Sequence, residues 1–500
     1  MPGNGELPIP NERNTMISAL HNARQDPSVT QQPLAVDLDG TLVKTDLLLE
    51  SILALVRRAP WSVLAFPLWL MKGKAFFKRE ISMRVSLDVS LLPYNQGLLE
   101  YLQSQHSQGR TLVLATAEEE GVARQVSEHL KIFQSVFASS GTVNLLGESK
   151  RDRLVRAFGE RGFDYAGNSR RDLPVWSSAR RAIVVNPSKG LQAAAMRVTK
   201  VEYVFGDKKR DVMTWVRALR LHQWFKNLLI FVPLAAAHRV DEVSLVLKAC
   251  VGFTAFGLLA SSVYILNDLL DLPDDRRHPR KRKRPFAAGD IPIISGLIMI
   301  PILLMLSCLL ALPLPGAFLG VMGGYYLITL GYSLRLKRVV LLDVMVLAGL
   351  FTLRMMAGSA AVSIWPSSWL LAFSTFIFLS LAMVKRYAEL GTAQVSGTEI
   401  ATARAYRVSD KEVLSSMGVA SGYASVLVLA RYIGSDTART LYSRQEMIWL
   451  LCPLLLYWIS YLWLVAHRGG MHDDPLVFAL KNNVSRITLL MMAAAAMIAI

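Results

Sequence analysis

Long apolar runs separated by short charged clusters occupy the second part of the chain. Nine stretches are apolar enough to form membrane-spanning helices, at residues 225–238, 243–266, 291–311, 314–331, 339–361, 367–384, 413–430, 447–466 and 484–500. Because a helix needs about 20 apolar residues to cross a hydrocarbon core, the first stretch is short and depends on flanking aromatic residues. The pattern predicts an all-α polytopic membrane bundle of about nine transmembrane helices over residues 211–500.

Shorter apolar runs alternate with helical patterns in the part of the chain before this bundle. Four runs have the character of buried strands, at 34–36, 111–115, 163–166 and 182–186, and helical patterns lie between them, for example at 123–130 and 150–158. Alternating strands and helices predict a doubly wound parallel sheet, which binds ligands at the carboxyl ends of its strands. The predicted α/β domain covers residues 33–210.

A predicted helical cap, at about 46–105, interrupts the sheet between its first two strands. The cap mixes aromatic and basic side chains, namely Trp61, Phe66, Trp69, Phe76 and Phe77 with Arg57, Arg58, Lys72, Lys74, Lys78 and Arg79. This mixture suits a membrane interface, and it suits equally well a cap that packs its rings on the sheet.

Composition narrows the class of protein. Of the 500 residues, 52% are hydrophobic, yet the formal net charge is +17, which excludes a disordered chain, a collagen and a disulfide scaffold. Cys250, Cys308 and Cys452 lie in apolar runs and form neither a metal-binding nor a disulfide pattern. Residues 1–32 are polar and lack the apolar core of a secretory signal, so we expect a disordered tail there.

Basic residues in the membrane part sort by loop. The loops after the second, fourth, sixth and eighth stretches hold the clusters at 276–284, 335–338 and 385–407 and Arg468. The positive-inside rule places these loops and the α/β domain in the cytoplasm, and the C-terminus outside. We therefore expect a multi-pass protein of the cell (inner) membrane. Since the largest basic cluster lies in a short loop between spans, nucleic acid is not an expected partner.

Polar motifs follow the predicted strands. Asp37-Leu38-Asp39-Gly40-Thr41 comes after the first strand, Thr116 ends the second, and Gly167-Asn168-Ser169-Arg170-Arg171-Asp172 follows the third, with Lys150 on a helix between them. In this order the four motifs resemble the haloacid dehalogenase (HAD) superfamily, and in particular its phosphatases of the phosphoserine-phosphatase type. The resemblance implies that Asp37 is the nucleophile and Asp39 the general acid and base. It also implies that Asp37, Asp39, Asn168 and Asp172 hold Mg²⁺, while Thr116 and Lys150 bind the phosphoryl group.

Asn168 departs from the family pattern, in which most members carry aspartate at this position. Asparagine keeps a carbonyl oxygen for Mg²⁺ but removes one negative charge, so we expect weaker metal binding. The alternative that the HAD-like domain is a noncatalytic regulatory or docking module therefore stays open.

The segment from Asn267 to Pro285 combines acidic and basic residues at the end of an apolar run. Asn267, Asp271 and Asp275 recur every four residues, so a continuous helix would place them on one face about 6 Å apart. Pro273 is expected to make that helix irregular, because it cannot donate to a preceding carbonyl. Seven Arg and Lys residues follow between positions 276 and 284. Carboxylates suit Mg²⁺ and guanidinium groups suit phosphate, so the segment predicts a site for both.

Further ionisable residues lie within the predicted spans. Asp343 and Arg354 are eleven residues apart and share a helix face, either at a site or in a structural ion-pair network. Lys385, Arg386 and Glu389 form another charged helix end. The acidic run His472-Asp473-Asp474-Pro475 is interpreted as a turn.

These residues resemble the UbiA prenyltransferase superfamily, with its nine-span bundle and NDxxDxxxD motif, over the whole membrane part. The runs at 220–227, 278–285, 332–337 and 385–390 are most similar to its decaprenyl-phosphate phosphoribosyltransferase branch. The resemblance implies catalytic roles for Asp268 and Asp271, and Mg²⁺ binding by Asp268, Asp271, Asp275 and Asp343. It implies substrate binding by Lys226, Asn227, Asn267, Arg284, Tyr332, Lys337, Arg354, Lys385 and Arg386.

The reaction that this resemblance implies joins a diphosphate co-substrate to a polyprenyl lipid in the membrane, with Mg²⁺ as cofactor. We expect transfer of 5-phosphoribose from phosphoribosyl diphosphate to a polyprenyl phosphate, and removal of the 5-phosphate by the HAD-like domain. The alternative is a prenyltransferase that moves a prenyl group from prenyl diphosphate to an aromatic or other acceptor. Both reactions use the same aspartate chemistry, so only the substrates separate them.

Overall fold

A computed structural model of the chain describes residues 32–140, 144–188, 190–206, 211–395, 405–471 and 474–500. The chain divides into two compact units. The N-terminal unit holds the chain up to Asp211 together with the segment Arg276–Ile294, and the membrane unit holds Val212–Asp275 and Ser295–Ile500. The tail predicted at 1–32 lies, apart from residue 32, outside the described residues. The sequence analysis set the boundary at 210, and the division into compact units falls after Asp211; the second piece of the N-terminal unit was not foreseen.

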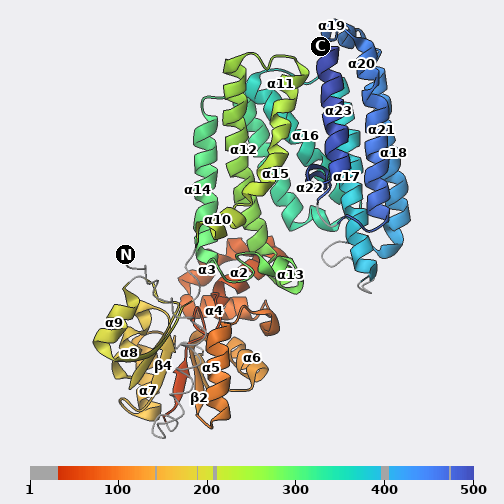
Figure 1. Cartoon of the computed structure of the whole chain (residues 1–500). Helices are drawn as coiled ribbons and strands as arrows, with labels where there is room; N and C mark the ends of the chain where they lie inside the picture. Colours follow the sequence, from red (N-terminus) through yellow and green to blue (C-terminus); the bar gives the residue numbers. More distant parts are fainter. Residues whose placement is uncertain (1–31, 141–143, 189, 207–210, 396–404, 472–473) are drawn as a thin grey trace, which may run out of the picture. The chain divides into compact units, whose positions relative to one another are not determined.

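The N-terminal unit is built on one parallel sheet of six strands in the order β3-β2-β1-β4-β5-β6 (Figure 1). The strands are β1 (Leu34–Val36), β2 (Leu112–Glu119), β3 (Ser135–Ser139), β4 (Asp164–Gly167), β5 (Arg181–Val185) and β6 (Lys200–Phe205). All four predicted strands are present, and β3 and β6 add an edge at each side. The doubly wound α/β prediction is confirmed.

Alternating side chains of the sheet fill two hydrophobic layers. Leu34 and Val36 pack with α5 (Gln96–Ser107) and α6 (Glu120–Leu130), while Ala35 packs with the opposite set of helices. That opposite set consists of α7 (Glu148–Phe158), α8 (Leu173–Ser178) and α9 (Leu191–Val198). The sheet is therefore covered on both faces, and its carboxyl edge is left for polar residues.

Between β1 and β2 the chain forms a small helical layer. It consists of α2 (Leu47–Arg58), η2 (Pro60–Ala65), α3 (Phe66–Met71) and α4 (Lys74–Ser82), and its core contains Leu55, Phe77 and Ile81. The Asp46 side chain accepts a hydrogen bond from Leu49 N and begins α2. The predicted cap range, 46–105, also contains η3 (Val89–Leu91) and α5, but α5 packs on the sheet itself. We therefore reserve the name cap for Leu47–Ser82.

The segment Arg276–Ile294 belongs to the N-terminal unit because its residues contact α2 and the loops beside it. The Arg276 guanidinium donates to both carboxylate oxygens of Glu50, at 2.8 and 2.6 Å, and both side chains are buried. Gly289 has φ +75°, and a Cβ there would lie 2.6 Å from the Lys44 Cβ. The buried two-point ion pair between Arg276 and Glu50 and the close approach at Gly289 thus hold this segment on the N-terminal unit.

The membrane unit contains seven helices long and apolar enough to cross a membrane, among the described residues. They are α12 (Val243–Leu270), α14 (Ile293–Ala311), α15 (Gly316–Leu334), α16 (Leu342–Val362), α17 (Ser368–Val395), η8 (Val408–Asp410) with α18 (Lys411–Ile433), and α20 (Gln445–Trp449) with α21 (Leu451–His467). A further pair, α22 (Pro475–Lys481) and α23 (Asn483–Ala499), is bent by 85° and counts as an eighth span if taken together. Shorter elements are α10 (Val212–Ala218), η5 (Leu221–Phe231), α11 (Val232–Ala236), α13 (Leu272–Arg277), η7 (Leu336–Arg338) and α19 (Asp436–Leu441). The short helix η6 (Lys281–Lys283) lies in the segment Arg276–Ile294 and belongs to the N-terminal unit. The chain is thus a multi-pass membrane protein.

The count of nine predicted spans is reduced to seven or eight within the described chain. The stretch at 225–238 forms most of η5 and all of α11, rather than one long α-helix. Pro233 lies in the first turn of α11 and lacks a backbone donor, which favours a break before it. Hydropathy detects the apolar run but not the form of its backbone, and this explains the overestimate.

Gly358 on α16 allows η5 to approach that helix closely. A Cβ at this position would lie 2.0 Å from the Ile230 carbonyl oxygen. Gly358→Ala is therefore expected to destabilise the membrane unit by about 1–3 kcal/mol through overpacking, read as a lower midpoint of thermal unfolding in detergent. Gly349→Ala on the same helix is the control, since nothing lies within 4 Å of its Cβ position. Equal midpoints for the two variants would contradict the expected clash.

Candidate functional sites

The first candidate site lies at the carboxyl end of the sheet in the N-terminal unit. Asp37 and Asp39 follow β1, Thr116 lies in β2, and Asn168 follows β4. Because β1 pairs in parallel with both β2 and β4, these positions meet at one edge. Gly40, with φ +70°, is in contact with Asn168, since a Cβ there would lie 2.0 Å from Asn168 Nδ2. Only glycine fits this turn.

A chain of hydrogen bonds connects the predicted nucleophile to the predicted metal loop. Lys150 Nζ donates to Asp37 Oδ1 at 2.7 Å and to the Tyr165 hydroxyl at 3.0 Å. That hydroxyl donates to Asp172 Oδ1 at 2.9 Å. Asp172 Oδ2 in turn accepts from the backbone N–H groups of Asn168 and Ser169, at 3.1 and 2.9 Å. Lys150 is thus aimed at Asp37, and Asp172 fixes the loop after β4.

Burial controls the protonation of the two aspartates after β1. Desolvation raises the pKa of Asp37 to about 6, and the Lys150 ammonium opposes this rise. Burial also raises the pKa of Asp39 well above its usual range, and the carboxylates of Glu118, Asp46 and Asp37 raise it further. Asp39 Oδ1 accepts a hydrogen bond from Leu47 N at 3.1 Å, which holds it at the start of α2. A pKa raised in this direction suits a carboxyl group that acts as a general acid.

The oxygens at this edge agree in part with a magnesium site. No three His, Cys, Asp or Glu side chains converge to hold a metal anywhere in the described part of the chain. Asp37 Oδ2, the Asp39 carbonyl and Asn168 Oδ1 are oxygen ligands of the kind that Mg²⁺ prefers. Asp172 instead has both oxygens engaged by protein donors, which suits positioning of the loop. Its assignment as a direct ligand stays a prediction.

Three residues of this site were missed by the sequence analysis. Tyr165 bridges Lys150 and Asp172, and Glu118 accepts a hydrogen bond from Lys78 of α4 at 2.9 Å. Lys78 also donates to the Ala117 carbonyl at 2.9 Å, beside Thr116. Thr116 Oγ1 accepts from Glu118 N at 3.0 Å and is fully buried. The position of Tyr165 in a strand next to β1 was the available signal, whereas the cap contact of Lys78 had none.

The second candidate site lies in the membrane unit, where α12 ends. Asp271 N donates to the Asn267 carbonyl at 2.9 Å, and Asp275 N donates to the Asp271 carbonyl at 2.8 Å. Helical spacing therefore continues across the break between α12 and α13, and Asn267, Asp271 and Asp275 follow one another on one face, as predicted. The break falls just before Pro273, which cannot donate to the Leu269 carbonyl.

Basic side chains hold two of these aspartates. Arg220 forms a salt bridge with Asp268, and Lys337 Nζ donates to both carboxylate oxygens of Asp271 at 2.9 Å. Asp268 and Asp275 are buried, as is the Asn267 Oδ1 atom, which has no hydrogen-bond partner among the described residues. Mg²⁺ is commonly bound through one or two carboxylates together with substrate phosphates, so this arrangement fits a metal that arrives with a diphosphate.

Arg354 is a buried cation whose hydrogen-bond acceptors within the described part of the chain are all neutral. Its guanidinium donates to Asn227 Oδ1 at 3.1 Å, to the Leu350 carbonyl at 2.7 Å and to the Tyr325 hydroxyl at 2.8 Å. The amide nitrogen of Asn227 is buried and has no acceptor among the described residues. A buried cation beside an unused donor is costly unless an anion completes the site. Arg354 and Asn227 therefore fit a phosphate.

Two lysines near Arg354 share one carboxylate. Asp474 Oδ2 accepts from Lys226 Nζ at 2.9 Å and from Lys385 Nζ at 3.0 Å. The Phe351 ring links the groups, since both Lys226 and Arg354 lie against it. Among the described residues of this cluster, three cations and one carboxylate leave a formal excess of two positive charges. Asp474 lies in the run interpreted as a turn, so its role was missed, while His472 and Asp473 lie outside the described residues.

Asp343 is bound by a different arginine from the one suggested by helix spacing. Arg386 forms a two-point salt bridge with Asp343, the Tyr332 hydroxyl donates to Asp343 at 2.7 Å, and Arg386 also donates to Glu389 at 2.6 Å. The alternative of a structural ion-pair network therefore fits Asp343, Tyr332 and Arg386 well. The metal-ligand role of Asp343 and the substrate roles of Tyr332 and Arg386 stay predictions. Arg284 belongs to the N-terminal unit, and its substrate role stays a prediction.

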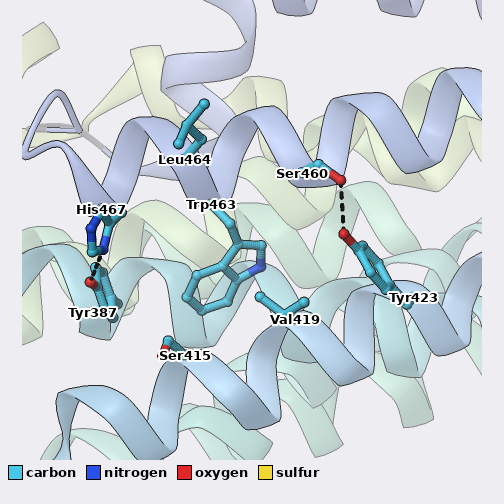
Figure 2. Close-up of a pocket in the computed structure, with 8 residues that line it drawn as sticks. All are labelled: Tyr387, Ser415, Val419, Tyr423, Ser460, Trp463, Leu464 and His467. Atoms are coloured by element: carbon cyan, nitrogen blue, oxygen red, sulfur yellow. Dashed lines mark hydrogen bonds between the residues drawn. The ribbon is translucent and has the colours of Figure 1, made fainter.

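A hollow of about 290 Å³ opens elsewhere in the membrane unit, between α17, α18 and α21 (Figure 2). Tyr387 and His467 are joined at one end at 2.9 Å, and Tyr423 and Ser460 at the other at 3.0 Å, with Trp463 between them. None of the predicted site residues lines it. We therefore place the chemistry at the charged clusters.

Comparison with known proteins finds relatives for most of the chain. The family model described as UbiA prenyltransferase family matches residues 228–483. An uncharacterized protein of Sinorhizobium fredii, y4nM, is 37% identical and covers 91% of this chain and 88% of its own length. A decaprenyl-phosphate phosphoribosyltransferase of Mycolicibacterium smegmatis is 33% identical, over 57% of this chain and 92% of its own. A structure of phosphoserine phosphatase in apo form aligns with 35% of this chain and 94% of its own, with 13% identity and a TM-score of 0.26.

Proposed function

The chain belongs to the UbiA prenyltransferase family, and we propose that its membrane unit transfers 5-phosphoribose from phosphoribosyl diphosphate to a polyprenyl phosphate. The observation that carries this proposal is the presence of two kinds of anion site. The end of α12 offers carboxylates for a magnesium-bound diphosphate, and the cluster of Arg354, Lys226 and Lys385 offers excess positive charge for a second phosphate. An acceptor that carries its own phosphate needs this second site, whereas a neutral aromatic acceptor does not.

The roles of the residues follow from charge. Asp268 and Asp271 would hold Mg²⁺, which stabilises the departing pyrophosphate. Lys337 and Arg220 then turn from these carboxylates to phosphate oxygens. As the bond between the sugar C1 and the diphosphate oxygen breaks, an oxocarbenium-like sugar forms, and an oxygen of the polyprenyl phosphate bonds to C1. Arg354, Asn227 and Lys226 would hold that phosphate in line. The relative named decaprenyl-phosphate phosphoribosyltransferase supports the same acceptor class and the same transferred group.

The deciding experiment supplies the purified chain with Mg²⁺, a polyprenyl phosphate and labelled phosphoribosyl diphosphate. We expect label in the lipid extract, and none when the polyprenyl phosphate is replaced by a polyprenyl alcohol. A complete lack of labelled lipid would overturn the proposal. Label transfer from prenyl diphosphate to an aromatic acceptor would favour the alternative reaction.

The N-terminal unit has a geometry that supports a phosphatase acting on the 5-phosphate of the lipid product. The Asp37 carboxylate would attack phosphorus while Asp39 gives its proton to the departing sugar oxygen, and water would then release the phosphate from Asp37. Lys150, at 2.7 Å from Asp37, and bound Mg²⁺ would screen the phosphate charge. By the positive-inside rule, we place the candidate site residues of both units on the cytoplasmic side of the cell membrane.

Asn168→Asp tests whether the lost charge limits this activity. Adding a carboxylate beside Gly40 is expected to lower the Mg²⁺ concentration for half-maximal phosphomonoester hydrolysis by about tenfold, because ligand charge strengthens binding of a hard cation. The measurement is hydrolysis of a water-soluble phosphomonoester against Mg²⁺ concentration. Asn186→Asp, which adds the same charge after β5, is the control. If both variants show the same Mg²⁺ dependence as the original chain, Asn168 does not contact the metal.

A further inference from the structure

The cap carries a row of large apolar side chains that nothing in the described chain covers. Trp61, Leu64, Leu68 and Met71 are 78%, 75%, 63% and 84% exposed. They recur every three or four residues along η2 and α3, so they share one helical face. Soluble surfaces do not present such a row without a partner.

The opposite face of the same segment is folded inward. Phe66 and Trp69 pack against Phe77 of α4, with ring centroids 5.5 and 6.5 Å apart. These rings join the cap core with Leu55 and Ile81. The exposed row is therefore the outer face of a folded element. The packing interpretation fits Phe66, Trp69 and Phe77, which lie in the cap core, and the membrane-interface interpretation stays a prediction for Trp61.

The net charge of the cap indicates what kind of surface covers its exposed apolar row. Residues 51–79 contain six Lys and Arg and no Asp or Glu. Lys72 and Lys74, at the end of α3 and the start of α4, are exposed beside the apolar row. An apolar face bordered by basic residues is the pattern of a helix that lies in the interface of an anionic bilayer. Because the chain also contains membrane-spanning helices, a bilayer is always within its reach.

We propose that the face formed by Trp61, Leu64, Leu68 and Met71 inserts into the surface of an anionic phospholipid bilayer. The cap then presents lipid-borne phosphomonoesters to Asp37. The connection is short, since α4 sends Lys78 to the Ala117 carbonyl and to Glu118, beside Thr116. Asp39 is likewise bound at the first residue of α2. This second part of the proposal rests on the proposed phosphatase activity, whereas insertion itself does not.

Insertion is tested on the full chain, in which Cys250, Cys308 and Cys452 are replaced by alanine. One cysteine is added at Leu64, or at Met196 of α9, which is 56% exposed, and labelled with a fluorophore. The labelled chains are placed in bilayer discs of phosphatidylcholine and phosphatidylglycerol at about 3:1, some with nitroxide on the acyl chains. We expect the nitroxide to quench the label at position 64 at least about fivefold more than the label at 196.

Two other outcomes would contradict insertion. A label at 64 that iodide in the buffer quenches as strongly as the label at 196 overturns the proposal, because the face is then in water. A label at 64 shielded from both iodide and the lipid nitroxide also overturns it, in favour of a protein surface as the occupant. The double variant K72Q/K74Q should reduce quenching at 64 only in discs with phosphatidylglycerol, since it removes attraction to anionic lipid.

The substrate part has a separate readout. The double variant L64Q/L68Q is expected to hydrolyse a water-soluble phosphomonoester at the original rate and a lipid-borne one about tenfold more slowly. Equal rates on both substrates would overturn the presentation role. If the original chain hydrolyses neither substrate while the label at 64 is quenched by lipid, the phosphatase proposal fails and membrane insertion stands.

Discussion

Asp271→Asn is expected to lower the rate of 5-phosphoribosyl transfer by about a thousandfold or more, with little change in folding. Asparagine has the same shape as aspartate but carries no charge for the cation that accompanies the diphosphate. In the structure Lys337 holds both oxygens of Asp271 at 2.9 Å, so a single ammonium already balances this carboxylate. Arrival of a magnesium diphosphate would exchange partners, giving the carboxylate to the metal and the ammonium to phosphate.

The measurement is the rate of labelled lipid formation at saturating substrates, with KM for the diphosphate as a second readout. Asp241→Asn, on the exposed turn before α12, makes the same chemical change away from the site and should leave the rate unchanged. Lys337→Met should mainly raise KM for the diphosphate, because it removes a phosphate contact. A full rate in Asp271→Asn would remove this residue from the reaction.

Asp37→Asn is expected to abolish phosphomonoester hydrolysis, by about a thousandfold or more, and to leave transfer of 5-phosphoribose intact. The amide cannot attack phosphorus, and the Lys150 ammonium loses its charged partner at 2.7 Å while keeping the Tyr165 hydroxyl. In the full chain the variant should accumulate the phosphorylated lipid product, whereas the original chain should release inorganic phosphate from it. If the variant loses hydrolysis but keeps transfer, the two reactions take place at two separate active sites.

Asp152→Asn is the matched control, because Asp152 is an exposed residue of α7 in the same unit. Mass spectrometry of the original chain, quenched in acid during turnover, should find the phosphate on Asp37. Hydrolysis that persists in Asp37→Asn would mean that the activity belongs to another group, and the noncatalytic interpretation of the N-terminal unit would regain support.

The fold was predictable wherever the pattern of the chain was strong. Strands β1, β2, β4 and β5 are buried apolar runs, and all four were found. The two edge strands were missed because their pattern is weak: β3 is mostly half-buried, and β6 is Lys-Val-Glu-Tyr-Val-Phe. An edge strand needs little burial, so its sequence resembles that of a loop.

Side-chain types at the candidate sites were predictable, but their partners were not. Helix spacing put Asp343 and Arg354 on one face, whereas Asp343 binds Arg386, and Arg354 binds Asn227 and Tyr325. A single sequence shows which residues lie on one helix and not which helices pack together. Asp474 was undervalued for the same reason, since its lysines lie 248 and 89 residues earlier in the chain.

The pairing of Arg276 with Glu50 has a consequence for how the chain can be divided and inherited. A gene fragment that stops at Asp211 encodes an N-terminal unit without its second segment, Arg276–Ile294. The buried Glu50 carboxylate then has no Arg276 guanidinium to pair with. Neither half is then a free-standing module that recombination could exchange at one junction. The N-terminal unit therefore depends on a segment that the chain supplies only after α12, and the two units are expected to fold correctly only as one polypeptide.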